Sequence, residues 1–404
     1  MTGAVPAARV AALRSIRAPE TGKLLDRAIV LFFPAPHSQT GEDCGEFQIH
    51  GGRAVIAAIL AELARLPGFR AAEPGEFSRR ALFNGKINLL ELEALADLVD
   101  SETERQRQQS LGSGIMLRGM AEHWRQLLLD IRAELEAGID FADEDDVARQ
   151  FVSRVPALLD DLIQALMRAL AGARRGERIR DGFRVALLGP PNAGKSSLIN
   201  ALAGRDVAIV SDIAGTTRDR IDVTLDIEGY AVIVSDTAGI RLSDELIERE
   251  GIRRSFDAAA EADLAIWLHP DGNTAPEIPA ELAGRVKVVL SKSDLVNNQL
   301  TTLAVDAIVN VKDESGLDPF LAFLGGNLAA DDIDREAVIV TRERQRLAIQ
   351  AALGALERAR SCVDLVEICA EEVRLGILEL DRLLGRVDVE EVLGAIFSRF
   401  CIGK

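Results

Sequence analysis

A glycine-rich segment of the chain has the residue types and spacing of a phosphate-binding loop. Its sequence is Gly189-Pro190-Pro191-Asn192-Ala193-Gly194-Lys195-Ser196, between the apolar run Val185–Leu188 and a helical pattern from Leu198 to Leu202. The glycines allow backbone N–H groups to turn towards a phosphate, Lys195 adds a positive charge at the β- and γ-phosphates, and Ser196 offers a hydroxyl to Mg²⁺. In this strand-loop-helix context, the segment predicts a nucleotide site.

Two later segments follow this loop in the order typical of GTPases. They are Gly215-Thr216-Thr217-Arg218-Asp219 and, after an apolar strand, Asp236-Thr237-Ala238-Gly239. Thr217 can bring a hydroxyl to Mg²⁺ when a γ-phosphate is bound, and Asp236 can hold the metal's water shell. The N–H of Gly239 can reach the γ-phosphate. Each segment alone is compatible with an ordinary loop, but their order and spacing predict a pair of GTPase switches.

The segment Ser291-Lys292-Ser293-Asp294 is the candidate for base selection, because it follows the apolar strand Val286–Leu290. Asp294 can accept hydrogen bonds from the two donors of guanine, which adenine lacks, and the stem of Lys292 can lie on the ring. GTPases usually have Asn where this chain has Ser291. We therefore expect guanine as the base, with a weakened side-chain contact to the base and to the phosphate loop.

The hydrolytic step needs a device other than the usual glutamine. Ile240 stands where Ras-like GTPases carry the Gln that orients the attacking water, and an aliphatic side chain cannot do this. Asn192 can ligate a monovalent cation together with backbone carbonyls of the Ser211–Thr216 loop, which places positive charge near the phosphates. A plain turn residue is the other interpretation of Asn192.

Composition limits the class of protein and its partners. The 404 residues are 48% hydrophobic and 27% charged, as in folded proteins of two or three domains. No apolar run reaches the ~18 residues of a membrane span, and the N-terminus lacks the pattern of a signal peptide, so a cytoplasmic location is expected.

The 4 cysteines are too few and scattered for a disulfide framework. A net charge of −17 repels polyanions, so contact with nucleic acid must be local or supplied by a partner.

The periodicity of apolar residues changes twice along the chain. Residues 28–69 predict a small α+β domain with a strand at Ala28–Phe33 and a helix at Ala54–Leu66, and residues 86–138 predict long amphipathic helices. Residues 183–324 predict a βαβ succession, and the helical period returns after Asp331. The expected strands of that succession are Arg184–Leu188, Tyr230–Ser235, Asp263–Leu268, Val286–Leu290 and Ala304–Val309.

The predicted fold class is therefore multidomain, α+β and α/β. A small N-terminal α+β domain (1–84) precedes a helical domain (85–180 and 329–404), which is interrupted by a P-loop GTPase domain (181–328) with a doubly wound, mostly parallel sheet. The basic run Arg174, Arg175, Arg178 and Arg180 marks the first junction. We interpret it as a solvated linker, with an RNA-contacting patch as the alternative.

Several further segments carry a resemblance to a known family. The chain ends Phe397-Ser398-Arg399-Phe400-Cys401-Ile402-Gly403-Lys404, preceded by Leu383-Leu384-Gly385 and Val389-Glu390-Glu391-Val392-Leu393. Other such segments are Phe33-Pro34-Ala35-Pro36, Thr40-Gly41-Glu42-Asp43, His50-Gly51-Gly52, Pro74-Gly75-Glu76-Phe77, Asn84-Gly85-Lys86 and Ile139-Asp140-Phe141. Over nearly its full length the chain resembles the MnmE (TrmE) family of tRNA-modification GTPases.

The resemblance implies a fold, an activity and partners. The family has an N-terminal dimerising domain that binds 5-formyltetrahydrofolate, and a helical domain split by a G domain. Its activity is potassium-stimulated GTP hydrolysis, coupled with the flavoprotein MnmG to a modification at carbon 5 of the wobble uridine (U34) of tRNA, of the carboxymethylaminomethyl type. By resemblance, this chain is expected to be a homodimer that uses Mg²⁺ and K⁺ and meets tRNA mainly within that complex.

The resemblance also assigns roles to single residues. Glu248, which stands nine residues after Gly239 and three before Gly251-Ile252, becomes the acid that orients water, and Cys401 becomes reactive, although the residues alone leave thiol and thiolate both open. The implied potassium ligands are Asn192, Ser211, Ile213 and Thr216, and the magnesium ligands are Ser196, Thr217 and Asp236. The remaining nucleotide-site residues are Ala193, Gly194, Lys195, Ser197, Gly215, Thr237, Ala238, Gly239, Ser291, Lys292, Asp294 and Lys404.

The chain departs from the family pattern in two places. Where the family has Ser-Ala-Lys-Thr-Gly-x-Gly, it has Asn310-Val311-Lys312-Asp313-Glu314-Ser315-Gly316, which predicts weaker guanine binding. The family's first Gly-rich Pro-Pro-Gly stretch has no counterpart, so folate binding and dimerisation are expected to be less secure than GTP hydrolysis. The alternative function is a nucleotide-dependent scaffold or assembly GTPase that has lost tRNA chemistry. A purely structural protein has no reason to keep Lys195, Thr217 and Asp236.

Overall fold

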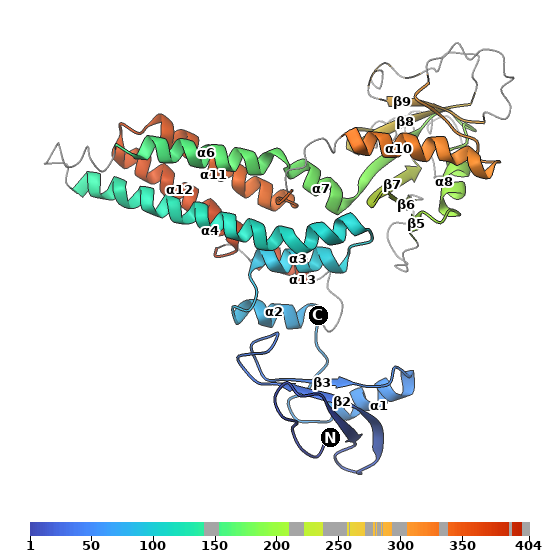
Figure 1. Ribbon diagram of the computed structural model, residues 1–404, viewed down its shortest axis with the longest axis vertical. Helices are drawn as coiled ribbons and strands as arrows, with labels where there is room; N and C mark the ends of the chain where they lie inside the picture. Colours follow the sequence, from blue (N-terminus) through green and yellow to red (C-terminus); the bar gives the residue numbers. More distant parts are fainter. Residues whose placement is uncertain are drawn as a thin grey trace, which may run out of the picture. The chain divides into compact units, whose positions relative to one another are not determined.

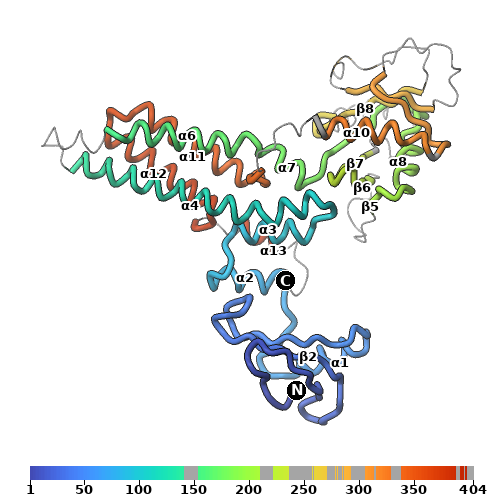
Figure 2. The backbone as a smooth tube through the Cα atoms, viewed as in Figure 1, coloured from blue at the N-terminus to red at the C-terminus, as the bar shows by residue number. Residues whose placement is uncertain are grey.

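The computed structural model describes most of the chain as two compact units (Figures 1 and 2). The described residues are 1–140, 153–209, 222–236, 257, 259–270, 278, 280, 284, 286–292, 305–330, 338–387 and 390–397. Unit 1 comprises Met1–Ala96, Leu117–Val155 and Ser361–Lys404, and unit 2 comprises Asp97–Met116 and Pro156–Arg360. The boundaries predicted between domains after residues 84, 180 and 328 stay predictions.

A seven-stranded sheet forms the centre of unit 2, with strand order β10-β9-β8-β4-β7-β6-β5. The strands β4, β7, β8, β9 and β10 are parallel, and β6 and β5 add an antiparallel edge. Their bounds are β4 Phe183–Leu188, β5 Ala208–Ile209, β6 Asp222–Ile227, β7 Tyr230–Asp236, β8 Leu264–His269, β9 Val286–Leu290 and β10 Ala307–Ile308. This confirms the mostly parallel sheet.

Two helices cover one face of this sheet. The helix α8 spans Lys195–Ala203, and α10 spans Asp318–Ala330 directly after the short 3₁₀ helix η2, Glu314–Leu317. Their buried side chains, such as Leu198 and Phe320, form one hydrophobic core with the strands, while Leu188 and Ala265 pack on the other face. Because central parallel strands are buried on both faces, β4 is an almost continuous apolar run.

The remaining helices confirm the predicted helical periods on both sides of the sheet region. They are α3 Leu89–Val99, α4 Glu104–Asp140, α6 Val155–Ala171, α7 Ala173–Asp181, α11 Glu343–Ser361, α12 Val366–Leu384 and α13 Glu390–Phe397. Within unit 1, α3 packs against α13 through Leu89, Leu92 and Ile396. No helix in the described part of the chain combines the length and apolar character that crossing a membrane requires.

The N-terminal part of unit 1 is a small α+β structure, as predicted. Its antiparallel sheet has the order β1-β2-β3, with β1 at Ala12–Arg17, β2 at Leu24–Phe33 and β3 at Cys44–Gln48. The helix α1, Arg53–Ala64, packs on the sheet through Ile59, which joins Ile16 and Ala28 in a small core. The helix α2 follows at Glu76–Phe83.

The basic run that we interpreted as a solvated linker is helical, so this interpretation was wrong. All of its arginines lie on α7. Arg178 forms an ion pair with Asp263, with 2.8 Å between Nε and Oδ1, and Arg180 pairs with Asp97 at the same distance. Long-range partners therefore hold the run as a folded element, and the RNA-contacting alternative stays untested.

One carboxylate joins the segments that enter and leave the sheet region. Asp97 accepts from Nε of Arg180 at 2.8 Å and from Nη2 of Arg342 at 2.6 Å, and the three side chains are only 11%, 19% and 15% exposed. Arg180 lies in the last turn of α7, just before β4, whereas Arg342 precedes α11. A Cβ on Gly176 of α7 would collide with the carbonyl oxygen of Val340, so the two segments run in direct contact.

Replacing Asp97 with alanine should lower the stability of unit 2 by roughly 1–3 kcal/mol, because two largely buried guanidinium groups lose the shared acceptor of their hydrogen bonds. The matched control is Asp181→Ala, since Asp181 also pairs with Arg180 but is 49% exposed. Its loss should cost less than about 0.5 kcal/mol. Urea unfolding of both variants checks this, and equal midpoints for the two would contradict it.

Candidate nucleotide-binding site

The phosphate loop lies at the carboxyl end of β4, at the N-terminus of α8. Gly194 is the N-cap residue of α8 and has a left-handed backbone, with φ of 100°. The first N–H groups of a helix have no partner within the helix, and together with the helix dipole they favour a bound anion. The predicted strand-loop-helix context is therefore confirmed.

Gly189 allows the loop to leave β4 close to the neighbouring strand. Its φ is 138°, and a Cβ at this position would lie 2.5 Å from the carbonyl oxygen of Leu268 in β8. Asn192 also has a positive φ, 62°, which asparagine tolerates better than most residues. Both positions thus need the residue types that the sequence supplies.

Lys195 is the first residue of α8 and is only 8% exposed. Its ammonium Nζ donates to the carbonyl oxygen of Gly189 at 2.8 Å and to that of Pro190 at 3.1 Å. The positive charge therefore lies against the loop that it is predicted to serve. Ser196 and Ser197 follow on the first turn of α8, and both are exposed.

Ser291 ties the candidate base-selecting segment to the phosphate loop. Its hydroxyl donates to the carbonyl oxygen of Ala193 at 2.6 Å, and its backbone N–H donates to that of His269 at 2.8 Å. The residue is 5% exposed. We expected a weakened contact to the phosphate loop, but the serine hydroxyl makes this contact at short distance. The expected weakening was therefore wrong for the contact to the phosphate loop. The expected weakening of the contact to the base stays a prediction.

Lys292 adds a second link between the same two segments. Its Nζ donates to the carbonyl oxygen of Asn192 at 2.7 Å, and its backbone is left-handed, with φ of 57°. The carbonyl groups of two consecutive loop residues, Asn192 and Ala193, are thus bound by two consecutive residues after β9. This arrangement fixes the spacing between the phosphate loop and the segment predicted to select the base.

Removing the hydroxyl in Ser291→Ala should therefore speed the release of bound GDP by about three- to tenfold, since one buried hydrogen bond is worth about 1 kcal/mol. Ser291→Thr keeps the hydroxyl and serves as the control. Stopped-flow release of a fluorescent GDP analogue measures the rates. If the alanine and threonine variants release GDP at the same rate, the hydroxyl does not stabilise the loop.

Asp236 lies at the same edge of the sheet, at the end of β7. Its backbone pairs with Leu187 of β4 in the parallel register, two residues before Gly189. The register thus places this predicted magnesium residue beside the start of the phosphate loop. The other predicted site residues lie outside the described part of the chain: Ser211, Ile213, Gly215, Thr216, Thr217, Thr237, Ala238, Gly239, Glu248, Asp294, Cys401 and Lys404.

The segment that departs from the family pattern, Asn310–Gly316, closes on itself after β10. The N–H of Asn310 donates to the carbonyl oxygen of Gly316 at 3.0 Å, and its Oδ1 accepts from the N–H of Lys312 at 3.0 Å. Asp313 accepts from the N–H of Ser315 and so caps η2. A Cβ on Gly316 would collide with the backbone of Asn310, so this glycine is required for the turn.

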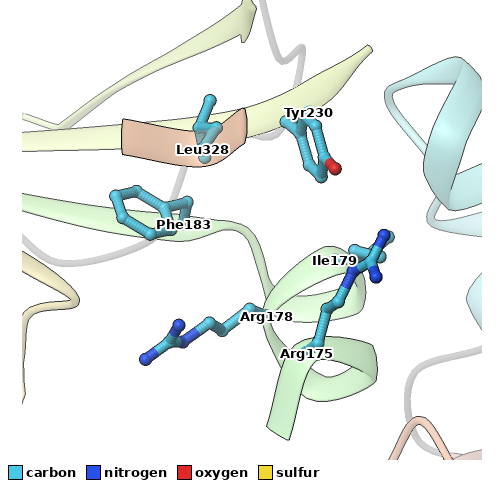
Figure 3. A pocket seen from close by; sticks show the side chains of 6 residues that line it. All are labelled: Arg175, Arg178, Ile179, Phe183, Tyr230 and Leu328. Atoms are coloured by element: carbon cyan, nitrogen blue, oxygen red, sulfur yellow. The ribbon is translucent and has the colours of Figure 1, made fainter. Parts of the chain in front are cut away.

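A small pocket of unit 2 lies at the other edge of the sheet. Figure 3 shows Arg175, Arg178 and Ile179 of α7 facing Phe183, Tyr230 and Leu328 across it. Phe183 and Tyr230 are the first residues of β4 and β7, whose last residues lie near the phosphate loop. With a volume of about 20 Å³ it holds about one water molecule, so it is not the nucleotide site.

The described part of the chain holds the cysteines Cys44, Cys362 and Cys369, and none of them forms a disulfide there. Burial raises the pKa of the Cys369 thiol to about 11. This thiol is therefore protonated at neutral pH and has little nucleophilic character.

Comparisons with known proteins agree with this architecture. Residues 2–86 match the family "GTP-binding protein TrmE N-terminus", and residues 89–401 match "MnmE helical domain". The tRNA modification GTPase MnmE of Beijerinckia indica is 47% identical over 409 residues, which cover 100% of this chain and 89% of the relative. The MnmE of Azorhizobium caulinodans is 45% identical, with coverage of 100% and 92%.

Solved structures of GTPases match only a part of the chain. The G domain of the T. maritima FeoB iron transporter is 22% identical and covers 36% of this chain and 98% of its own. Its TM-score to this chain is 0.27.

Proposed function

The chain belongs to the MnmE family, and we propose that it is a GTP hydrolase that acts in the modification of tRNA. The observation that supports this most is the phosphate loop held by the segment after β9. Lys195 begins α8 at this loop, and Ser291 and Lys292 bind the carbonyl oxygens of Ala193 and Asn192.

Ser196 and Asp236 fit a magnesium ion chemically, because a hydroxyl and a carboxylate oxygen are ligands that Mg²⁺ prefers. The parallel pairing of β4 with β7 places Asp236 beside the start of the phosphate loop, and Ser196 follows this loop in the first turn of α8. Thr217 is the third proposed ligand. When bound, the ion neutralises charge on the β- and γ-phosphates. Lys195 binds the same phosphates, and backbone N–H groups at the start of α8 orient them.

Water activation is assigned to residues other than Ile240. Glu248 orients the attacking water, and Asn192, Ser211, Ile213 and Thr216 hold a potassium ion. Asn192 suits this role because Lys292 already binds its backbone carbonyl, while the residue itself is exposed at the rim of the loop. An amide oxygen remains as its donor to a cation.

The partners follow from family membership. We propose that the protein acts with the flavoprotein MnmG on carbon 5 of U34, as a homodimer that binds 5-formyltetrahydrofolate through its N-terminal domain, with Cys401 as a reactive residue. The net charge of −17 favours a tRNA contact made mainly through the complex. The alternative is a scaffold GTPase without tRNA chemistry.

Nucleoside analysis of tRNA from a deletion strain tests the function and separates these two. We expect loss of the carboxymethylaminomethyl modification at U34 and its return when the intact gene is supplied. Unchanged U34 in the deletion strain, together with GTP turnover by the purified protein, would favour the scaffold alternative.

Replacing sodium with potassium should speed GTP hydrolysis by at least about tenfold, because a cation near the phosphates stabilises the charge that develops in the transition state. Asn192→Ala should remove most of this gain. Single-turnover hydrolysis in both salts measures it, with Asn200→Ala, an exposed position of α8, as the control. Equal rates of the parent protein in both salts would exclude the cation.

A further inference from the structure

The turn between β6 and β7 contacts the beginning of α4 within unit 2. The turn residues Glu228 and Gly229 both have positive φ, 54° and 85°, as a two-residue type I′ turn requires. Oδ1 of Asp226 accepts from the N–H of Gly229 at 2.8 Å. The turn is therefore a tight, hydrogen-bonded end of the β6–β7 hairpin.

Arg105 of α4 makes the contact with this turn. Its guanidinium carbon lies 4.0 Å from the centre of the Tyr230 ring, a short cation–π distance. Its Nε donates to the carbonyl oxygen of Glu228 at 3.3 Å, and its backbone N–H donates to that of Gly229 at 3.4 Å. The hydrogen bonds are long, so the ring contact is the strongest part of the set.

The beginning of α4 is also fixed by its own residues. Thr103 and Gln106 form a capping box, in which Oε1 of Gln106 accepts from the N–H of Thr103 at 3.1 Å. Nε2 of Gln106 donates to the carbonyl oxygen of Arg180 at 3.1 Å. Because the first N–H groups of a helix lack partners within it, the bond from Arg105 N–H to Gly229 makes the hairpin part of the cap.

The hairpin leads from this contact to the nucleotide site. Ile227 pairs with Tyr230 at the turn, and Asp222 pairs with Ser235 next to Asp236 at the far end. Six paired residues of a strand span roughly 20 Å. Because every residue of β6 is paired with β7 between these two ends, we expect a shift near Asp236 on nucleotide exchange to reach the turn.

We propose that Arg105 is a positioning residue that couples the nucleotide state of the sheet to the first turn of α4. Arg105 contacts both Tyr230 and the turn, so a movement of the hairpin stabilises or destabilises the N-terminal cap of α4, which runs from Glu104 to Asp140. This inference rests on the proposed GTP binding, and it adds the path by which the bound nucleotide is sensed outside the sheet.

Amide hydrogen exchange of the full chain with Mg²⁺ tests the proposal. Exchange at residues 103–110 is compared with GDP and with a non-hydrolysable GTP analogue, in the parent protein and in Arg105→Ala. The matched control is Arg107→Ala, since Arg107 lies on the same turn, is exposed and pairs with Glu104. Arg105→Lys keeps a cation near the ring and should preserve part of the response.

We expect the two nucleotides to change exchange in this segment by about three- to tenfold in the parent and in Arg107→Ala, and by less than about twofold in Arg105→Ala. An equal nucleotide response in Arg105→Ala and the parent would overturn the proposal, as would a parent without any response. If Arg105 only stabilises the cap of α4, Arg105→Ala should show faster exchange with both nucleotides. The difference between the two nucleotides should then be the same as in the parent protein.

GTP binding and turnover are measured on the same samples. If the parent protein does not bind GTP, the proposed function fails. If it binds and hydrolyses GTP but residues 103–110 do not respond, only the coupling through Arg105 fails. Tyr230→Phe, which keeps the ring, should behave as the parent protein and so separates the ring contact from the phenol hydroxyl.

Discussion

Lys195→Ala should abolish measurable GTP turnover and leave the fold of unit 2 intact. The Lys195 ammonium lies 2.8 Å from the Gly189 carbonyl oxygen at the edge of the loop, where the β- and γ-phosphates are proposed to bind. Losing a preorganised charge that acts on the transition state costs on the order of 10³-fold or more in rate. Single-turnover hydrolysis at saturating GTP measures the loss, and thermal unfolding checks the fold.

The control for this variant is Lys287→Ala. Lys287 lies on β9 of the same sheet, and its Nζ pairs with Asp306 at 3.2 Å, away from the phosphate loop. Removing it should change turnover by less than about twofold, because an exposed ion pair contributes little. Near-normal hydrolysis by Lys195→Ala would rule out the assigned site.

Gly189→Ala should disrupt the phosphate loop and lower nucleotide affinity by about a hundredfold or more, since strain of roughly 3 kcal/mol has to be relieved by moving the loop. The added Cβ would lie 2.5 Å from the carbonyl oxygen of Leu268, and the φ of 138° is unsuitable for alanine. Equilibrium titration with a fluorescent GDP analogue measures the affinity.

Gly204→Ala is the matched control, because Gly204 lies at the other end of α8 with an ordinary φ of −86°. A Cβ there would make only van der Waals contacts, the nearest at 3.7 Å. This variant should bind nucleotide as the parent protein does. If both variants bind GDP equally well, the close approach of β8 does not shape the loop.

The sequence predicted those elements whose pattern is local. The phosphate loop, α8 and the buried strands β4, β8 and β9 have apolar runs or spacings that specify them directly. Of the strand expected at 304–309, the structure describes residues 305–309, and within these the strand β10 spans Ala307–Ile308. The strands β1 and β6 were not predicted. In β6 the sequence Asp-Val-Thr-Leu-Asp-Ile mixes polar and apolar residues because its strand lies near the antiparallel edge of the sheet.

Contacts between distant residues account for what the sequence left open. The partner of Arg178 is Asp263, far along the chain, so nothing near α7 indicated an ion pair. The hydroxyl of Ser291 meets the carbonyl oxygen of Ala193 only because β4, β8 and β9 are neighbours in the sheet. The hydroxyl of Ser291 also donates to the backbone carbonyl oxygen of His269. Such a contact cannot be predicted from residue types, because every residue has a backbone carbonyl group.

The contact of Gly176 with Val340, beside the pairing of Asp97 with Arg180 and Arg342, has an evolutionary consequence. When the two ends of an inserted domain lie side by side, the surrounding domain does not need to rearrange if the inserted domain is gained, lost or exchanged. In the described part of unit 2, the chain therefore enters the sheet through α7 and leaves it through the segment before α11, and these two segments are in contact. Recombination within these two segments would exchange the part of the chain between them and would keep the contact of Gly176 with Val340.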